Sequence, residues 1–153
     1  MLDNSIYGFR MIESIRDERS IQTIKIKLCN GKICVAKSFY QSYCIQENEQ
    51  MAFMINLNTI CKLKYPSLLP LDGYNLRNYE KLLYPITFTQ YLPNGSLEDF
   101  LNSLKQNKKQ INWTKTDDYI TLLGISLGLN YLHTNNIVHQ NIKLSNILLD
   151  DNC

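Results

Sequence analysis

The segment His139-Gln140-Asn141-Ile142-Lys143-Leu144-Ser145-Asn146-Ile147-Leu148-Leu149-Asp150 decides how this chain is interpreted. Two short apolar runs, Ile137-Val138 and Ile147–Leu149, lie on either side of its polar part. Short β-branched runs of this kind favour strands, so we expect two short strands that flank a polar loop. The polar side chains of this loop are the first candidates for functional residues.

A long apolar helix is predicted before the loop. Thr114 and Asp117 have the spacing of a capping box, in which a hydroxyl is followed three residues later by a carboxylate. The helix should continue to about His133, which would lie at its C-terminus, where a cation is favoured. Its apolar part, Tyr119 to Leu132, is interrupted by polar residues and is too short to span a bilayer.

A β-hairpin is predicted near the N-terminus. Residues Ile21 to Leu28 alternate, with Ile24 and Ile26 on one face and lysines on the other. Lys32 to Phe39 should form the returning strand. Asn30-Gly31 lies between them, and this dipeptide tolerates the positive φ angles of a type I′ turn.

Between the hairpin and the long helix, further elements alternate. Glu47 to Lys64 has helical periodicity and should end at Tyr65-Pro66. Two strands, a turn, a helix that starts with the capping pair Ser96 and Asp99, and a polar connector should follow. Their expected bounds are Leu68 to Tyr74, Leu82 to Tyr91, Pro93 to Gly95, Ser96 to Leu104 and Lys105 to Ile111. Strands that precede helices in this way predict an α+β protein in two lobes.

Composition narrows the class of protein. The 153 residues are 44% hydrophobic and 20% charged, which is typical of one globular domain. A net charge of +2 gives no reason to expect nucleic acid or an anionic membrane as a partner. Five cysteines at scattered spacings predict free thiols rather than a zinc site. The acidic, polar N-terminus is unlike a secretory signal, so a soluble cytoplasmic protein is expected.

Five motifs in order resemble the protein kinase domain, of the tyrosine-kinase-like or serine/threonine type. Val35-Ala36-Lys37 resembles the lysine strand, and Tyr65–Leu69 the segment after the kinase C-helix. Thr89–Leu97 is similar to the hinge, Tyr131–His139 to the lead-in to the catalytic loop, and Asn146–Asp150 to the segment after it. The resemblance implies a small β-rich N-lobe with one C-helix at 7–92, and the start of an incomplete helical C-lobe at 93–153.

The resemblance also implies a site for ATP. Lys37 would contact the α- and β-phosphates, and the alternative is a solvated strand lysine with no such role. Val35 takes the place of the usual alanine over the adenine and narrows that pocket. The hinge residues assigned to nucleotide binding are Thr89, Gln90 and Leu92.

In the catalytic loop the resemblance places Asn141 at the position of the catalytic aspartate. An amide has no basic oxygen to receive a proton. Gln140 replaces the arginine that contacts a phosphorylated activation loop in the family. Lys143 matches the lysine that helps to hold the transferred phosphate, and Asn146 matches the magnesium ligand. Alternatively, Asn146 only closes the loop by hydrogen bonding to its backbone. His139 is expected to be a packed core residue.

Two further departures from the family weaken the expected activity. The segment Arg16 to Thr23, where the Gly-rich phosphate loop should lie, contains no glycine and holds the carboxylates of Asp17 and Glu18. The C-helix glutamate is replaced by Asn56, and Glu49 could substitute for it only with a shift of register.

A D-F-G segment would be expected about ten residues after Asp150, whereas the sequence stops at Cys153. The apolar helix from Tyr119 to Leu132 would then expose a face that either aggregates or binds a partner. These features predict an inactive kinase-like domain that binds ATP and Mg²⁺ weakly or not at all and acts through an unknown protein partner. The alternatives are an active serine/threonine kinase of which this is a part, and a non-functional fragment.

Overall fold

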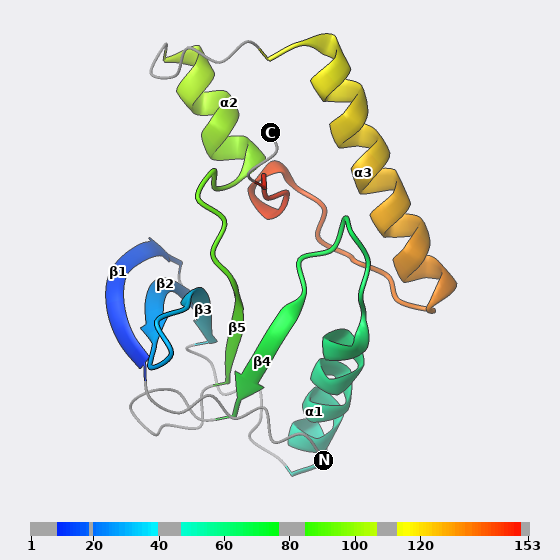
Figure 1. Cartoon of the computed structure of the whole chain (residues 1–153). Helices are drawn as coiled ribbons and strands as arrows, with labels where there is room; N and C mark the ends of the chain where they lie inside the picture. Colours follow the sequence, from blue (N-terminus) through cyan, green and yellow to red (C-terminus); the bar gives the residue numbers. More distant parts are fainter. Residues whose placement is uncertain (1–8, 19, 40–46, 77–84, 107–112, 151–153) are drawn as a thin grey trace. The chain divides into compact units, whose positions relative to one another are not determined.

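The computed structural model describes residues 9–18, 20–39, 47–76, 85–106 and 113–150, without the side chains of 47–50 (Figure 1). These residues form two compact units, which are described separately below. The first lies within Met1–Lys64 and Leu69–Tyr91, and the second within Tyr65–Leu68 and Leu92–Cys153. The predicted division into 7–92 and 93–153 stays a prediction.

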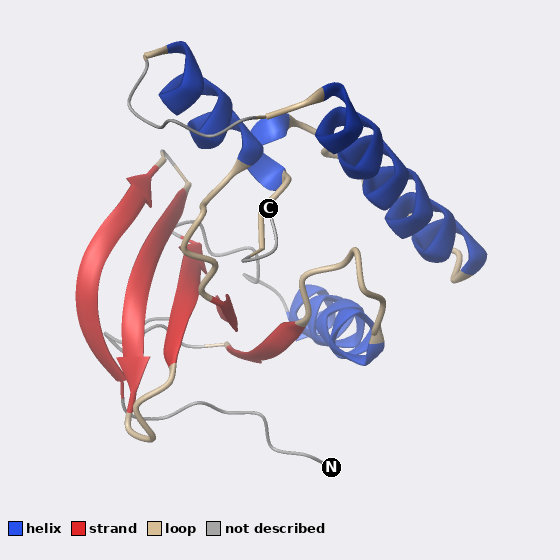
Figure 2. Ribbon diagram, turned by 45° about the horizontal axis from the view of Figure 1, so that its top comes forward, coloured by secondary structure: helices blue, strands red, loops and turns tan. Residues whose placement is uncertain are grey.

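The first unit is built on a sheet of five antiparallel strands in the order β1-β2-β3-β5-β4, drawn in red in Figure 2. The strands are β1 (Phe9–Asp17), β2 (Ile21–Leu28), β3 (Ile33–Phe39), β4 (Leu71–Asn75) and β5 (Ile86–Gln90). Strand β4 begins later than predicted, and residues 82–84 of the other predicted strand lie outside the described residues. The combination of this sheet with helices confirms the α+β class.

Strand β1 was not among the segments predicted from the sequence pattern. Its pairing with β2 shifts register between Met11 and Glu13 and again between Ser14 and Arg16. A β-bulge interrupts the alternation of faces along a strand. Strict alternation is the signal by which a strand is recognised, so β1 shows no period of two in its sequence.

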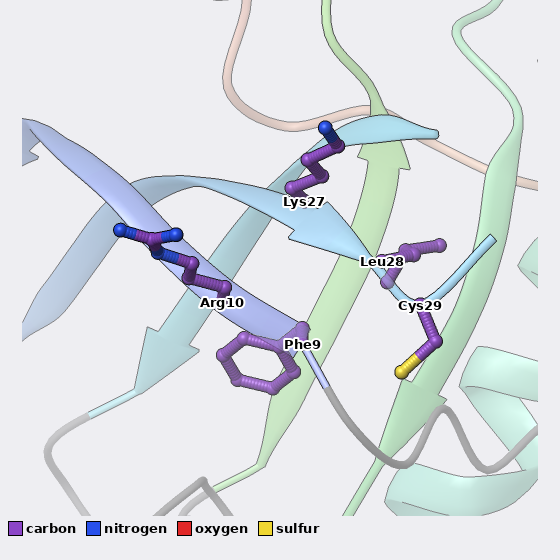
Figure 3. A pocket seen from close by; sticks show the side chains of 5 residues that line it. All are labelled: Phe9, Arg10, Lys27, Leu28 and Cys29. Carbon is purple, nitrogen blue, oxygen red and sulfur yellow. The ribbon is translucent and has the colours of Figure 1, made fainter. Parts of the chain in front are cut away.

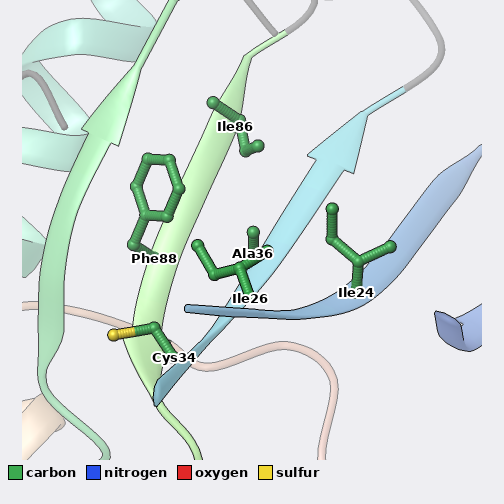
Figure 4. Packing of buried hydrophobic residues seen from close by; sticks show 6 residues of the cluster. All are labelled: Ile24, Ile26, Cys34, Ala36, Ile86 and Phe88. Carbon is green, nitrogen blue, oxygen red and sulfur yellow. The ribbon is translucent and has the colours of Figure 1, made fainter. Parts of the chain in front are cut away.

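The core of the first unit lies on one face of the sheet. Ile24 and Ile26 of β2 are fully buried, which confirms the face predicted from the alternation. Neighbouring strands contribute the other members of the cluster, and Figure 4 shows their side chains together. The cluster consists of Ile24, Ile26, Cys34, Ala36, Ile86 and Phe88. The opposite face, which contains Lys37, is called the open face below.

The turn between β2 and β3 differs from the predicted type I′ turn. Gly31 has a φ of +85°, whereas Asn30 is not among the described residues with positive φ. A type I′ turn needs positive φ at both positions. Instead the Gly31 N–H donates to the Leu28 carbonyl at 2.9 Å, and the Leu28 N–H donates to the Lys32 carbonyl at 2.9 Å. A single left-handed glycine after a tight turn closes this hairpin.

Helix α1 (Glu47–Lys62) ends two residues before the predicted end at Lys64. It lies beside β4 in Figure 1. Leu57 is its buried apolar residue, and Asn58 accepts a 3.0 Å hydrogen bond from the Tyr74 hydroxyl. Much of the described remainder of α1 is exposed, including Met51 and Ile55.

The second unit contains α2 (Leu97–Lys105) and α3 (Lys115–Thr134). Both begin at the predicted caps. Ser96 Oγ accepts from the Asp99 N–H at 3.2 Å, and Thr114 with Asp117 forms a full capping box. Helix α2 buries Leu97 and Phe100 in a small core. The predicted connector lies partly outside the described residues, at 107–112.

Helix α3 ends in a Schellman motif. Asn136 has a φ of +58°, its N–H donates to the His133 carbonyl at 2.9 Å, and the Ile137 N–H donates to the Leu132 carbonyl at 2.9 Å. His133 lies in the last turn, as predicted. The chain therefore leaves α3 in a fixed direction towards the loop at His139.

One side of α3 packs against the segment Tyr65–Leu68. The rings of Tyr65 and Tyr131 stack with centroids 4.7 Å apart, and Gly128 lies against Ser67. Another side is apolar and exposed, as expected from the sequence. Its most exposed members are Tyr119, Ile120, Leu122 and Leu123, which are 59–70% exposed.

In the part of the chain that the structure describes, no helix is both long enough and apolar enough to cross a membrane. Cys34 and Cys61 are free thiols, whereas Cys44 and Cys153 lie outside the described residues.

Candidate functional site

The predicted nucleotide residues of the first unit lie on the open face of the sheet. Val35 pairs directly with Thr89, and Lys37 pairs with Thr87. Residues directly opposite each other in antiparallel strands point to the same face. The sheet therefore brings Val35, Lys37 and Thr89 together, with Val35 half-buried and Lys37 exposed.

The segment expected to form a phosphate loop is a tight turn between β1 and β2. The Glu18 N–H donates to the Ile21 carbonyl at 2.9 Å, and the Ile21 N–H donates back to the Glu18 carbonyl at 3.3 Å. Arg16 lies 3.7 Å from the Glu18 carboxylate. Glu18 thus presents a carboxylate at this turn, and the sequence from Arg16 to Thr23 contains no glycine, the residue that lets a backbone approach phosphate oxygens most closely.

The C-helix position gives no carboxylate among the described side chains. Asn56 is exposed on α1. The side chain of Glu49 lies outside the described residues. The suggested substitution of Glu49 for Asn56 therefore stays a prediction.

The hinge residues are divided between the two units. Gln90 ends β5 and is exposed, whereas Leu92 belongs to the second unit and is half-buried. The Gly95 N–H donates to the Leu92 carbonyl at 3.2 Å, and Gly95 has a φ of +70°. This left-handed glycine forms the predicted turn before α2.

The loop after α3 is held by its own side chains. The Asn146 side-chain amide donates to the Asn141 carbonyl at 2.9 Å, and the Asn141 N–H donates to His139 Nδ1 at 3.3 Å. Gln140 has a φ of +62°, which is uncommon for a residue other than glycine. The loop-closing role considered for Asn146 therefore has a direct structural counterpart.

Two expectations about this loop need correction. His139 is exposed rather than packed in a core, and its Nδ1 accepts a backbone hydrogen bond. Ile137-Val138 is not a strand, and Ile147–Leu149 forms only an isolated bridge, from Leu148 to Ser96. A short apolar run pairs with the backbone that lies beside it in the fold. For Leu148 that backbone is Ser96, at the start of α2.

The segment after the loop is anchored to the N-terminus of α2. The Leu97 N–H donates to the Ile147 carbonyl at 2.7 Å, and the Leu149 N–H donates to the Gly95 carbonyl at 3.0 Å. Leu149 is also buried between Leu97 and Phe100. These contacts fix one end of the loop that holds Asn141.

The remaining loop residues offer few ligands for Mg²⁺. Lys143 is exposed, and its carbonyl accepts from the Asn146 N–H at 2.9 Å. Asn146 uses its amide nitrogen within the loop, which leaves one neutral oxygen for a metal. Mg²⁺ is usually bound through carboxylates. Among the described residues no three His, Cys, Asp or Glu side chains gather in a metal-binding group, so this donor set alone does not fit the ion.

A cluster that the sequence analysis missed lies on the open face. The Lys25 ammonium is 3.1 Å from a Glu13 carboxylate oxygen and 4.1 Å from the centroid of the Tyr91 ring. Hydrogen bonding to Glu13, then to Tyr91, raises the pKa of Lys25 above its ordinary value. The alternation of β2 predicts the face of Lys25, but nothing in the sequence links it to Tyr91, 66 positions later.

A shallow pocket lies at the end of the β1–β2 pair where Phe9 pairs with Leu28 (Figure 3). It has a volume of about 340 Å³ and is lined by Phe9, Arg10, Lys27, Leu28 and Cys29. None of the predicted site residues is among these. The predicted functional residues therefore lie on the open face and in the loop rather than in this pocket.

Comparison with known proteins agrees with the fold and the loop. The family model described as "Protein tyrosine and serine/threonine kinase" matches residues 24–153. Similar curated proteins include the leucine-rich repeat receptor-like protein kinase PEPR1 of Arabidopsis thaliana, 33% identical over 82% of this chain and 11% of that protein. Another is the LRR receptor-like serine/threonine-protein kinase SIK1 of Oryza sativa subsp. japonica, 34% identical over 84% of this chain and 12% of that protein.

The sheet, the anchored loop and these matches define a class of protein. The chain belongs to the protein kinase family, and it is part of a kinase domain. Its curated relatives are receptor-like kinases, and the chain spans about a tenth of their length.

Proposed function

We propose that this kinase-family chain does not transfer phosphate and acts by binding a protein partner. The observation that supports this most directly is Asn141 at the position of the catalytic aspartate. An aspartate would receive the proton of the attacking hydroxyl, whereas an amide oxygen is not basic enough to do so. Loss of general-base assistance lowers the rate by about 10²–10⁴-fold.

The phosphate end of the first unit supports the same proposal. The tight turn at Glu18 to Ile21 offers carboxylate rather than open backbone, and like charges repel a triphosphate. Asn56 offers no carboxylate to orient Lys37.

Weak nucleotide binding fits the residues that remain. Lys37 can attract phosphate, and Val35 with its cross-strand neighbour Thr89 provides a half-buried surface for a base. Asn146 alone is a poor magnesium ligand set, for the reason given above. We therefore propose binding that is weak and largely independent of Mg²⁺.

The exposed apolar side of α3 supports a binding role. Tyr119, Leu122 and Leu123 follow one another at helical spacing and are each at least 59% exposed. Contiguous apolar patches of this kind are typical of surfaces that contact protein.

Phosphotransfer from radiolabelled ATP to a general protein substrate tests the proposal. We expect no turnover above background for the chain. Because the Asn146 hydrogen bond reaches the backbone of residue 141, an Asn141→Asp variant should keep the loop closed while restoring the base. Turnover by the parent chain that disappears in a Lys37→Ala variant would overturn the proposal.

The alternative function is a serine/threonine kinase of which this chain is one part. Lys37, Lys143 and Asn146 match the family pattern, and the printed name of a relative is serine/threonine-protein kinase. A longer chain that contains these residues and phosphorylates serine or threonine would favour this alternative.

A further inference from the structure

Three side chains from distant parts of the first unit meet on the open face of the sheet. Lys25 of β2 lies 3.1 Å from Glu13 of β1 and 4.1 Å from the ring centroid of Tyr91, which follows β5. The Lys25 side chain is only 18% exposed, compared with 54% for Glu13. A lysine on an open face usually extends its ammonium into water. The low exposure of Lys25 indicates that its side chain lies along the sheet instead.

The strand register shows what lies beneath Lys25. Glu13 pairs with Lys25, Lys25 with Val35, and Val35 with Thr89, so these residues form one row across four strands. Tyr91 directly follows the last residue of β5, and the Lys25 ammonium over its ring places that ring on the same face as Lys25. A Lys25 side chain that reaches Tyr91 from β2 must cross β3 beside Val35.

The contacts reinforce one another. An ammonium over an aromatic face is attracted by the ring, and a carboxylate on its other side adds a charge-assisted hydrogen bond. The raised pKa of Lys25 agrees with a charged form that is stabilised in this position. Lys27, two residues along β2 on the same face, is exposed and provides a matched comparison.

We propose that Glu13, Lys25 and Tyr91 form a clamp that covers the Val35–Thr89 row, and that the clamp must open before a nucleotide base can lie there. The second part rests on the proposed function, because only the resemblance assigns the base to this row. The first part does not.

Thiol labelling tests the covering of Val35. A Val35→Cys variant is alkylated, and the rate at position 35 is read by peptide mass spectrometry, which separates it from the native cysteines. Adding Lys25→Met should raise this rate by about tenfold. Loss of the cation–π contact and the ion pair of Lys25 should increase by about this factor the fraction of molecules in which position 35 is uncovered. Adding Lys27→Met should leave it unchanged.

Binding of a fluorescent trinitrophenyl-ATP analogue tests the second part. Lys25→Met should bind it about tenfold more tightly, although the substitution removes a positive charge. Lys27→Met removes the same charge and should bind no more tightly than the parent. Glu13→Gln, which retains the Lys25 side chain, should give an intermediate gain in both assays.

The outcomes separate the parts of the proposal. An unchanged labelling rate in folded Lys25→Met and Glu13→Gln variants, judged by circular dichroism, overturns the clamp. A raised labelling rate with unchanged nucleotide affinity supports the clamp and overturns its link to the base. The proposed lack of phosphotransfer is tested separately by the turnover assay. A failure of that proposal would therefore be recognised independently of the labelling and nucleotide-binding results.

Discussion

The Asn146 side-chain amide donates a 2.9 Å hydrogen bond to the backbone carbonyl of Asn141, which joins the two ends of the polar loop. The donor is a side chain and the acceptor is not. The closure of the loop therefore depends on the residue at position 146 and is independent of the side chain at position 141. The side chain at position 141 can therefore be substituted without removing this hydrogen bond.

The first prediction concerns this hydrogen bond. Asn146→Ala and Asn146→Asp both remove the donor and should lower the free energy of unfolding by about 0.5–1.5 kcal/mol. Asn141→Asp should leave it nearly unchanged. Trp113, the single tryptophan, lies in the second unit against Phe100, so urea unfolding can be followed by its fluorescence. Equal stability of Asn146→Asp and the parent would contradict the closing role.

The second prediction concerns the end of α3. Asn136 holds a left-handed conformation that costs a residue with a Cβ roughly 1–2 kcal/mol. Asparagine tolerates this conformation better than alanine, and glycine does so without the cost. Asn136→Ala should lower the thermal midpoint of the Trp113 transition, whereas Asn136→Gly should preserve or raise it. Loss of stability in both variants would show that the Asn136 side chain itself matters.

The third prediction compares two glycines of α3. A Cβ at Gly128 would meet the Ser67 carbonyl oxygen at 3.3 Å, whereas a Cβ at Gly124 would meet only Ser67 Oγ, at 3.8 Å. Alanine is favoured over glycine in a helix interior by about 1 kcal/mol. Gly124→Ala should therefore stabilise the second unit in chemical denaturation, and Gly128→Ala should fail to do so. The same gain in both variants would mean that α3 is not closely packed against Ser67.

The fourth prediction concerns pH. Hydrogen bonds from the Thr114 hydroxyl, and then from its backbone N–H, hold the pKa of Asp117 below the ordinary value of 3.8. A group whose pKa is depressed on folding stabilises the folded state above its unfolded pKa, and this is lost as the pH falls through the folded value. Asp117→Asn should therefore destabilise α3 near neutrality and reduce the loss of stability below pH 3.8. Parallel acid titrations of variant and parent, followed by circular dichroism, check this.

Local signals in the sequence predicted much of the fold. The β2–β3 hairpin follows from strict alternation, and the starts of α2 and α3 follow from hydroxyl caps at Ser96 and Thr114. Each of these depends on residues within four positions of one another. Strand β1 escaped prediction because its two bulges remove the alternation.

The candidate site was predictable only in part, because contacts between residues far apart in the sequence leave no local pattern. Order along the chain identified Asn141 and Asn146, and the structure adds the hydrogen bond between them. The cluster of Glu13, Lys25 and Tyr91 depends on a register across four strands, which no local pattern encodes. The sequence pattern predicted a short strand at Ile147–Leu149, whereas Leu148 forms an isolated bridge with Ser96. A partner so far back in the sequence leaves no local pattern.

The anchoring of the loop to the start of α2 has a consequence for the order of folding. The Asn94 side chain donates to the Asp150 carbonyl at 2.7 Å, across 56 positions of sequence. Closing so long a segment is slow compared with forming a hairpin between neighbouring strands. During synthesis the β2–β3 hairpin can pair as soon as Phe39 has left the ribosome, whereas the second unit must wait for Asp150. A nascent chain that ends before Leu149 would lack one of the three buried members of the cluster with Leu97 and Phe100, and apolar surface exposed in this way is prone to aggregation.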